Sequence, residues 1–211
     1  MDPDDNNPSD NSTEHQRENQ GARFHWISHS PVVAASLFEG GLAALAVLIA
    51  LPLGLAPWEL MAAGWDTLLL GLLGTLPLLG LLVVLSRAEW GWVRDLRDNV
   101  MPAFMGWFRD TGVAGFGLVA ILAGVGEELL FRGVIQDGLQ LLWGPWPALI
   151  VASLLFGLVH AVSRAYFIAA TLMGTYLGAV YLWTGNLLVP IIIHALYDWI
   201  ALLYYQRRLH R

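Results

Sequence analysis

Long apolar stretches, separated by short polar or turn-forming segments, dominate the chain from residue 32 onward. Apolar runs of about 17–25 residues are long enough to cross a bilayer as helices. The runs in this chain predict six transmembrane helices, at residues 32–55, 68–85, 111–143, 148–163, 166–183 and 186–205. We therefore expect an all-α fold, namely a polytopic membrane helical bundle.

The apolar run over residues 111–143 is longer than the others. At about 1.5 Å per residue, a helix of this length exceeds the roughly 30 Å hydrocarbon core of a bilayer. We expect it to tilt, to protrude, or to break near Gly124 and Gly126. Glycines also let neighbouring backbones approach closely.

Two regions outside the spans have a different composition. Residues 1–30 are rich in Asp, Asn, Ser and Gln with almost nothing to bury, which predicts a disordered tail. In residues 86–110, arginines are interleaved with tryptophans and phenylalanines, as expected of a segment that lies in the membrane interface. The chain then divides into a cytoplasmic tail at 1–30, two transmembrane helices with an interfacial segment at 31–110, and a helical core at 111–211.

Composition agrees with a membrane protein. The chain is 56% hydrophobic and 13% charged, which is more apolar than a soluble domain of this size could bury. It has no cysteine, which excludes thiol nucleophiles and disulfides. Its net charge of −6 indicates no nucleic-acid partner.

Arginines indicate the orientation of the chain. With six spans, the tail, residues 86–110, the turn at Arg164 and the C-terminus fall on one side, and they hold ten of the eleven basic residues. Because cytoplasmic segments are enriched in basic residues, both termini are expected in the cytoplasm. We expect an integral protein of a bacterial inner membrane.

A charged stretch, G-V-G-E-E-L-L-F-R-G at residues 124–133, interrupts the apolar core. Charge in such surroundings costs several kcal/mol unless it is paired or hydrated. In a helix, Glu128 lies one turn from Arg132 on the same stripe, whereas Glu127 points elsewhere. Glu128 can therefore pair with Arg132 and leave Glu127 for chemistry. Alternatively, both glutamates only neutralise the arginine and lock two helices together.

Three more polar residues lie inside predicted spans. His160 follows Phe156 by one turn, and His194 and Asp198 form an i, i+4 pair. Each alone also fits a structural hydrogen bond between helices. Together with Glu127, they supply the groups needed to activate a water and to stabilise an oxyanion.

Three motifs carry a family resemblance: E-E-L-L-F-R at 127–132, F-G-L-V-H at 156–160 and H-A-L-Y-D at 194–198. They resemble the EExxxR, FxxxH and Hxxx(N/D) motifs of the CPBP family, the type 2 CAAX prenyl endopeptidase and bacteriocin-processing or self-immunity group. The resemblance covers about residues 112–205. It implies an intramembrane glutamic endopeptidase with its catalytic core at 111–211.

By position, the resemblance implies that Glu127 is the general base that activates water, that His160 helps to hold this water, and that His194 and residue 198 stabilise the oxyanion. The supporting residues that it implies are Glu128, Arg132 and Phe156. Prenyl-processing members have Asn where this chain has Asp198, so Asp198 is either protonated by burial or orients His194. The implied reaction hydrolyses a peptide bond of a membrane-associated or lipidated protein or peptide without a cofactor or metal.

Two other function classes stay open. Glu127, His160, His194 and Asp198 could bind zinc in a metal-dependent intramembrane protease, although the chain has no HExxH motif. A non-enzymatic membrane immunity or binding protein could use the same polar cluster as a structural core or a proton path. Cleavage assays of Glu127 variants discriminate between the enzyme and the binding protein.

The predicted topology can be tested with reporter fusions. Fusions at residues 60 and 185 should report a location outside the cytoplasm, because both positions fall in loops on the side opposite the arginines. A cytoplasmic signal from either fusion would contradict six spans with both termini inside.

Overall fold

The structure is a computed structural model that describes residues 30–209, and every regular element in this range is a helix. The predicted all-α membrane bundle is confirmed for these residues. The longer helices are α2 (Pro31–Leu53), α3 (Trp65–Arg87), α6 (Val113–Glu128), α8 (Pro145–Val159), α9 (Arg164–Thr184) and α10 (Leu188–Leu209). The shorter ones are η1 (Pro57–Leu60), α4 (Gly91–Asp95), η2 (Leu96–Val100), α5 (Met101–Trp107), η3 (Leu129–Gln136) and α7 (Asp137–Trp143). Except for Ser30, the tail predicted at residues 1–30 lies outside the described residues.

Within the described residues, five helical stretches are long and apolar enough to cross a membrane, and the predicted span at 148–163 is shorter than expected. This span is α8, whose 15 residues reach only about 22 Å. Residues 144–147 lie between two predicted spans, but only Gly144, whose φ is 80°, stays outside the helices. Pro145 instead takes the first helical position, where the missing N–H of a proline costs no hydrogen bond. At its other end α8 stops at Val159.

The longest helical stretch, Val113–Trp143, runs through α6, η3 and α7. The chain stays helical at Gly124 and Gly126, so the expected break does not occur at this pair. The irregularity comes just afterwards, in η3, which has the wider π-helical hydrogen bonding. Segments of this kind are frequent at functional sites.

Gly124 and Gly126 bring α6 into backbone contact with two neighbours. A Cβ on Gly124 would lie 3.0 Å from the carbonyl oxygen of Ile191 in α10. A Cβ on Gly126 would collide with the carbonyl oxygen of Glu39 in α2. The close approach that the sequence predicts for these glycines therefore occurs, and it holds α6 between α2 and α10.

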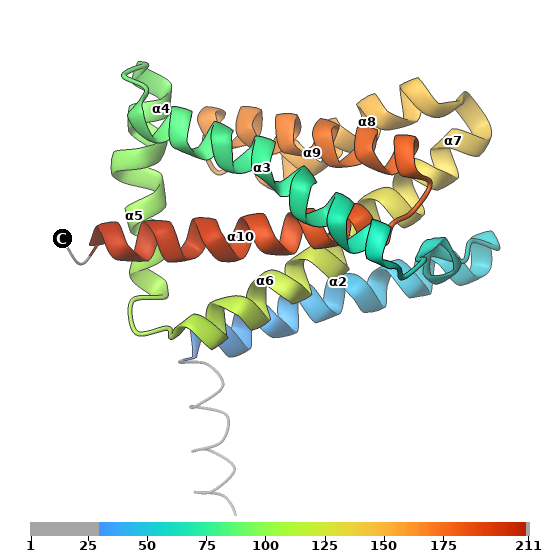
Figure 1. The fold of residues 1–211 in the computed structure, drawn as a ribbon, viewed down its shortest axis with the longest axis horizontal. Coiled ribbons are helices and arrows are strands. Elements are labelled where there is room, and N and C mark those ends of the chain that lie inside the picture. Colours follow the sequence, from blue (N-terminus) through green and yellow to red (C-terminus); the bar gives the residue numbers. More distant parts are fainter. Residues whose placement is uncertain (1–29, 210–211) are drawn as a thin grey trace, which may run out of the picture.

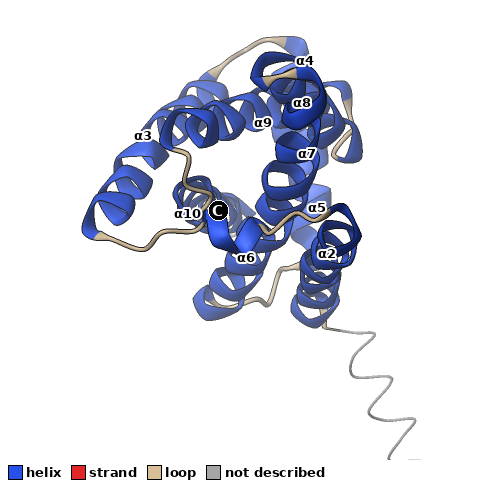
Figure 2. Ribbon diagram, turned by 90° about the vertical axis from the view of Figure 1, so that its right-hand side faces the viewer, coloured by secondary structure: helices blue, strands red, loops and turns tan. Residues whose placement is uncertain are grey.

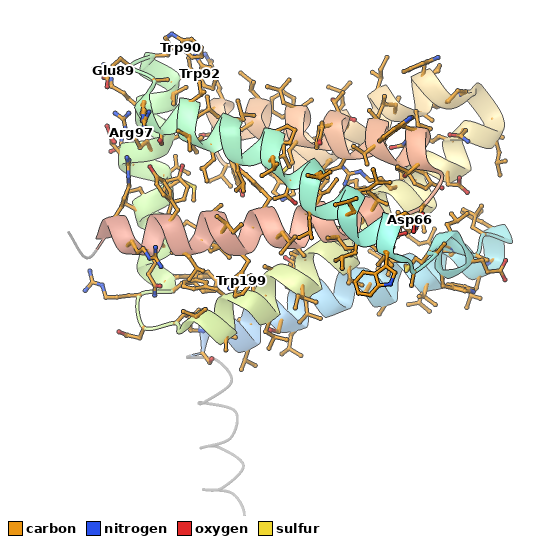
Figure 3. The ribbon with its side chains drawn as sticks, in the orientation of Figure 1. Asp66, Glu89, Trp90, Trp92, Arg97 and Trp199 are labelled. Carbon is orange, nitrogen blue, oxygen red and sulfur yellow. The ribbon has the colours of Figure 1, made fainter. Side chains whose placement is uncertain are left out.

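The remaining long helices complete the bundle around α10 (Figures 1 and 2). α8 and α9 form a hairpin, and α3 packs on α10, with Leu78 in a buried cluster with Val189 and Ile193. On the other side of α10, the indole Nε1 of Trp199 donates to the carbonyl of Val113 at 3.1 Å (Figure 3). A separate buried cluster of α2, η3, α8, α9 and α10 side chains surrounds the charged stretch of the sequence.

Both ends of the described chain lie at one end of the bundle, where α5 runs across the long helices (Figure 1). Gln206 near the end of α10 donates to the carbonyl of Thr111 at 2.7 Å. At the other end, the backbone N–H of Leu187 donates to the carbonyl of Leu60 at 2.8 Å, so the two loops chosen for reporter fusions adjoin. Which end faces the cytoplasm stays a prediction.

Aromatic and charged side chains gather where α3 leads into α4 (Figure 3). Trp90 and Trp92 stack with ring centroids 5.9 Å apart. Arg97 donates to Asp98 at 2.8 Å and lies 3.9 Å from Glu89. These residues belong to the segment predicted to lie in the membrane interface, a location that stays a prediction.

Replacing Gly126 with alanine should destabilise the fold, because the added methyl group meets the backbone of Glu39 and α2 must shift. Overpacking of this kind costs about 1–3 kcal/mol. Thermal unfolding in detergent should show a lower midpoint temperature. Gly80→Ala is the matched control, since a Cβ on this α3 residue meets no atom within 4 Å. Equal midpoints for the two variants would contradict the close contact of α2 with α6.

Candidate active site

Glu128 and Arg132 form a buried ion pair, as their spacing predicts. Nη1 of Arg132 donates to Oε1 of Glu128 at 2.6 Å. The side chain of Arg132 is 1% exposed and that of Glu128 is 0% exposed. Nη2 of Arg132 donates to the carbonyl of Gly174 in α9 at 2.9 Å, and its guanidinium carbon lies 4.6 Å from the ring centre of Phe156 in α8. Arg132 therefore fastens η3 to α8 and α9, with its charge compensated inside the protein.

The same oxygen of Glu128 also holds a histidine. His194 in α10 places its Nδ1 2.8 Å from Oε1 of Glu128. Because a carboxylate only accepts, Nδ1 carries the hydrogen of this bond. Arg132 and His194 thus both engage Glu128, which fixes the orientation of the imidazole and leaves its Nε2 for other partners.

His160 is fixed in the same way by the backbone. It is the residue that directly follows α8, and its Nδ1 lies 2.7 Å from the carbonyl oxygen of Phe156. A carbonyl only accepts, so Nδ1 carries the hydrogen here too. The imidazole also packs on the Phe156 ring, with centroids 4.6 Å apart, and meets the Tyr166 ring edge-on at 5.7 Å. Nε2 of His160 therefore stays available to other groups of the site.

Glu127 faces both of these Nε2 atoms. Its Oε2 lies 3.7 Å from Nε2 of His160 and 3.9 Å from Nε2 of His194. Both separations are too long for a direct hydrogen bond and suit polar groups bridged by a water. Oε2 of Glu127 is buried and has no hydrogen-bond partner among the described residues.

Asp198 lies at the edge of this group. Its Oδ2 is 3.4 Å from Nε2 of His194, and its side chain is 30% exposed. Because Glu128 already engages Nδ1, Asp198 meets His194 at the nitrogen that also faces Glu127. Glu128 therefore orients the His194 imidazole, and Asp198 lies beside the Nε2 atom that faces Glu127.

The carboxylate oxygens and imidazole Nε2 atoms that converge here differ in whether they accept or donate hydrogen bonds. Carboxylate oxygens accept hydrogen bonds, and an imidazole Nε2 accepts when the ring is neutral and donates when it is charged. A water molecule, which both donates and accepts, fits among such atoms and could be deprotonated there. In the described part of the chain, no group of three His, Asp or Glu side chains is arranged to hold a metal ion.

The structure brings together every site residue that the sequence predicts: Glu127, Glu128, Arg132, Phe156, His160, His194 and Asp198. It adds Glu39 from α2 and Tyr166 from the first turn of α9. Glu39 carries a signal in the sequence, since it is the one ionisable residue of its span and intramembrane charges usually mark function. Tyr166 carries no comparable signal.

Residues 109–200 match the family model described as type II CAAX prenyl endopeptidase Rce1-like. This match covers somewhat less than half of the chain. The resemblance predicted from the three motifs is confirmed, because the matched segment contains all three. The Rce1-like match leaves out α2 and α3, and therefore Glu39.

A curated relative, the uncharacterized protein YpbD of Bacillus subtilis (strain 168), is 39% identical over 83 residues. The alignment covers 38% of this chain and 40% of YpbD, so the two proteins match over less than half of either length. No solved structure matches the chain significantly. The five long apolar helices, together with the Rce1-like match, support an integral membrane protein.

Arg132→Ala should destabilise the protein more than Glu127→Ala. Loss of the arginine leaves Glu128 buried without its charge partner, at a cost of roughly 3–5 kcal/mol. Loss of Glu127 removes a carboxylate whose Oε2 has no direct hydrogen-bond partner in the described part of the chain. Thermal unfolding of both variants in detergent measures the difference, and equal midpoint temperatures would contradict the assigned pairing.

Proposed function

We propose that the protein is a CAAX-type intramembrane endopeptidase that hydrolyses a peptide bond of a membrane-associated or lipidated protein or peptide. In this proposal a water activated by Glu127 is the nucleophile. The observation that carries it is the different environment of two adjacent glutamates. Arg132 and His194 both engage Oε1 of Glu128, whereas Oε2 of Glu127 is buried, lies near two imidazoles and has no hydrogen-bond partner within residues 30–209. The Rce1-like match supports the protease class.

The first step is the activation of water. A water between Oε2 of Glu127 and Nε2 of a neutral His160 donates one hydrogen to each acceptor, and its oxygen keeps a lone pair for the carbonyl carbon of the substrate. Glu127 takes the proton as this oxygen attacks. The bond from Nδ1 of His160 to the Phe156 carbonyl keeps Nε2 turned toward the water.

The second requirement is a donor for the oxyanion. His194 already uses Nδ1 on Glu128, so it can donate from Nε2 only as an imidazolium. Carboxylate oxygens of Glu128, Asp198 and Glu127 lie 2.8, 3.4 and 3.9 Å from its ring nitrogens, and negative neighbours favour the charged ring. A charged His194 then stabilises the tetrahedral intermediate.

Exposure indicates how a substrate reaches these groups. The side chains of His160 and Asp198 are 23% and 30% exposed, whereas those of Glu128 and Arg132 are fully buried. A peptide therefore approaches past the C-terminal end of α8, and the Glu128 to Arg132 pair lies behind the reactive atoms. We place the protein in a bacterial inner membrane with both termini in the cytoplasm, in keeping with its arginine distribution and its Bacillus relative.

A metal-dependent protease is a second candidate, and one observation favours it. Each imidazole donates from Nδ1 and turns Nε2 toward a carboxylate, as metal-bound histidines do. Glu127, His160, His194 and Asp198 would be the ligands in this candidate, although no three of them are arranged to hold an ion in the described part of the chain. A bound ion would lower the pKa of a water.

Glu127→Gln tests the proposed function. The variant keeps the shape of the side chain but removes the base, so cleavage of a membrane peptide should fall by about 10²–10⁴-fold. Its thermal midpoint should match that of the wild type. Glu59→Gln, which changes an exposed carboxylate in η1, is the matched control and should cleave normally. Full activity in Glu127→Gln would contradict the proposal.

Asp198→Asn separates the two candidates. A site that works with water alone should tolerate Asn, which keeps the size of the side chain and can donate to the oxyanion. Complete loss of activity in Asp198→Asn, together with loss on chelation and rescue by Zn²⁺, would favour the metal-dependent protease.

A further inference from the structure

Glu39 is an ionisable residue in the middle of an apolar helix, and it faces the interior of the protein. The side chains just before it, Leu37 and Phe38, are 64% and 65% exposed. Oε2 of Glu39 is instead buried and has no hydrogen-bond partner among the described residues. Such a group is costly inside a membrane span and marks a functional position by default.

Helix packing puts residue Glu39 near Glu127. The backbone of Glu39 touches Gly126, which directly precedes Glu127, and a side chain at Gly126 would prevent this contact. Four charged groups that act on Glu39 are site residues from three other parts of the bundle, namely Glu127, His194, Asp198 and His160. Tyr166 of α9 also lies within electrostatic reach of Glu39. Helix α2 therefore supplies a further carboxyl to the site from outside the Rce1-like match.

The proposed reaction needs a proton on one of the two carboxyls, Glu39 or Glu127. Two neighbouring carboxylates in apolar surroundings repel each other when both are ionised, so such a pair tends to hold one proton. Glu127 must be the ionised member, since it is the base in the proposed reaction. Hydrolysis also needs an acid, because the leaving nitrogen has to gain a proton as the C–N bond breaks.

We propose that Glu39 is a further catalytic residue, which carries a proton and donates it to the leaving nitrogen. The water oxygen bonds to the carbonyl carbon while one water proton moves to Glu127. The C–N bond then breaks with its electron pair on nitrogen, which takes the proton of Glu39, and the second water hydrogen stays on the new carboxyl group. Transfer of the proton from Glu127 to Glu39 restores both groups. This inference deepens the proposed function and rests on it.

Glu39→Gln tests the role in catalysis, since it keeps the size of the side chain and removes the transferable proton. With a membrane peptide as substrate, kcat should fall about 10²–10⁴-fold with little change in KM. The part of the alkaline limb of the kcat pH profile that reports Glu39 should disappear, and the part that reports the charged His194 should stay. A purely structural carboxyl would be replaced well by Gln. Glu59→Gln is the matched control and should keep the wild-type kcat and pH profile.

Infrared difference spectroscopy tests whether the Glu39 carboxyl is protonated, without relying on activity. The wild type should show a protonated carboxyl band that Glu39→Gln lacks and Glu59→Gln retains, in variants with unchanged thermal midpoints. If no such band is lost with Glu39, the inference is overturned whatever the activity. If cleavage is lost in Glu127→Gln but unchanged in Glu39→Gln, this inference is overturned and the proposed function stands. If the wild type cleaves no peptide, the proposed function fails, and the role as catalytic acid fails with it.

Discussion

The rest of the site depends on the double use of one carboxylate oxygen, Oε1 of Glu128. It accepts from Arg132 and from His194, so a single buried atom compensates a guanidinium and sets the direction of an imidazole. A buried ion pair adds little net stability, but it fixes the register of the elements that carry it. Here it joins η3 to α10, and through Arg132 to α8 and α9. Because Glu128 meets these demands, its neighbour Glu127 stays available for the proposed activation of water.

Backbone atoms complete the site. The carbonyls of Gly174 and Phe156 accept from Arg132 and His160, and glycines in α6 let α2 and α10 approach at the same level. The helices thus provide acceptors that no substitution of a side chain can remove. Against this background, Oε2 of Glu127 and Oε2 of Glu39 are two of six buried side-chain atoms that have no hydrogen-bond partner among the described residues. Unsatisfied groups of this kind lower stability, and proteins retain them mainly where function requires them.

Local spacing allowed much of this arrangement to be predicted from the sequence. The i, i+4 rule pairs Glu128 with Arg132, and it separates Glu127 from them, because adjacent residues on a helix point about 100° apart. The close packing at Gly124 and Gly126 also follows from the residue type. The predicted start of α8 at residue 148 is wrong, because proline is well tolerated in the first turn of a helix and the helix begins at Pro145.

Other features needed the fold. The hydrogen bond between His194 and Glu128 joins residues 66 positions apart, and no local rule predicts it. Glu39 was visible as a charge in an apolar span, but only the packing of α2 on Gly126 shows which site it faces. The π-helical form of η3 likewise depends on its neighbours in space, since its residues are ordinary helix formers apart from Gly133.

The protonation of the two site histidines tests the central claim most directly, because it determines which atoms can accept from water and which can donate to an oxyanion. It can be measured from ¹⁵N chemical shifts of labelled protein at neutral pH, with His160→Asn and His194→Asn variants for assignment. We expect His160 to be neutral with its hydrogen on Nδ1, and His194 to carry hydrogens on both nitrogens. A neutral His194 with a bare Nε2 would contradict its proposed role as oxyanion donor and would favour the metal-dependent protease. A hydrogen on Nε2 of His160 would remove the acceptor that holds the water in the proposed mechanism.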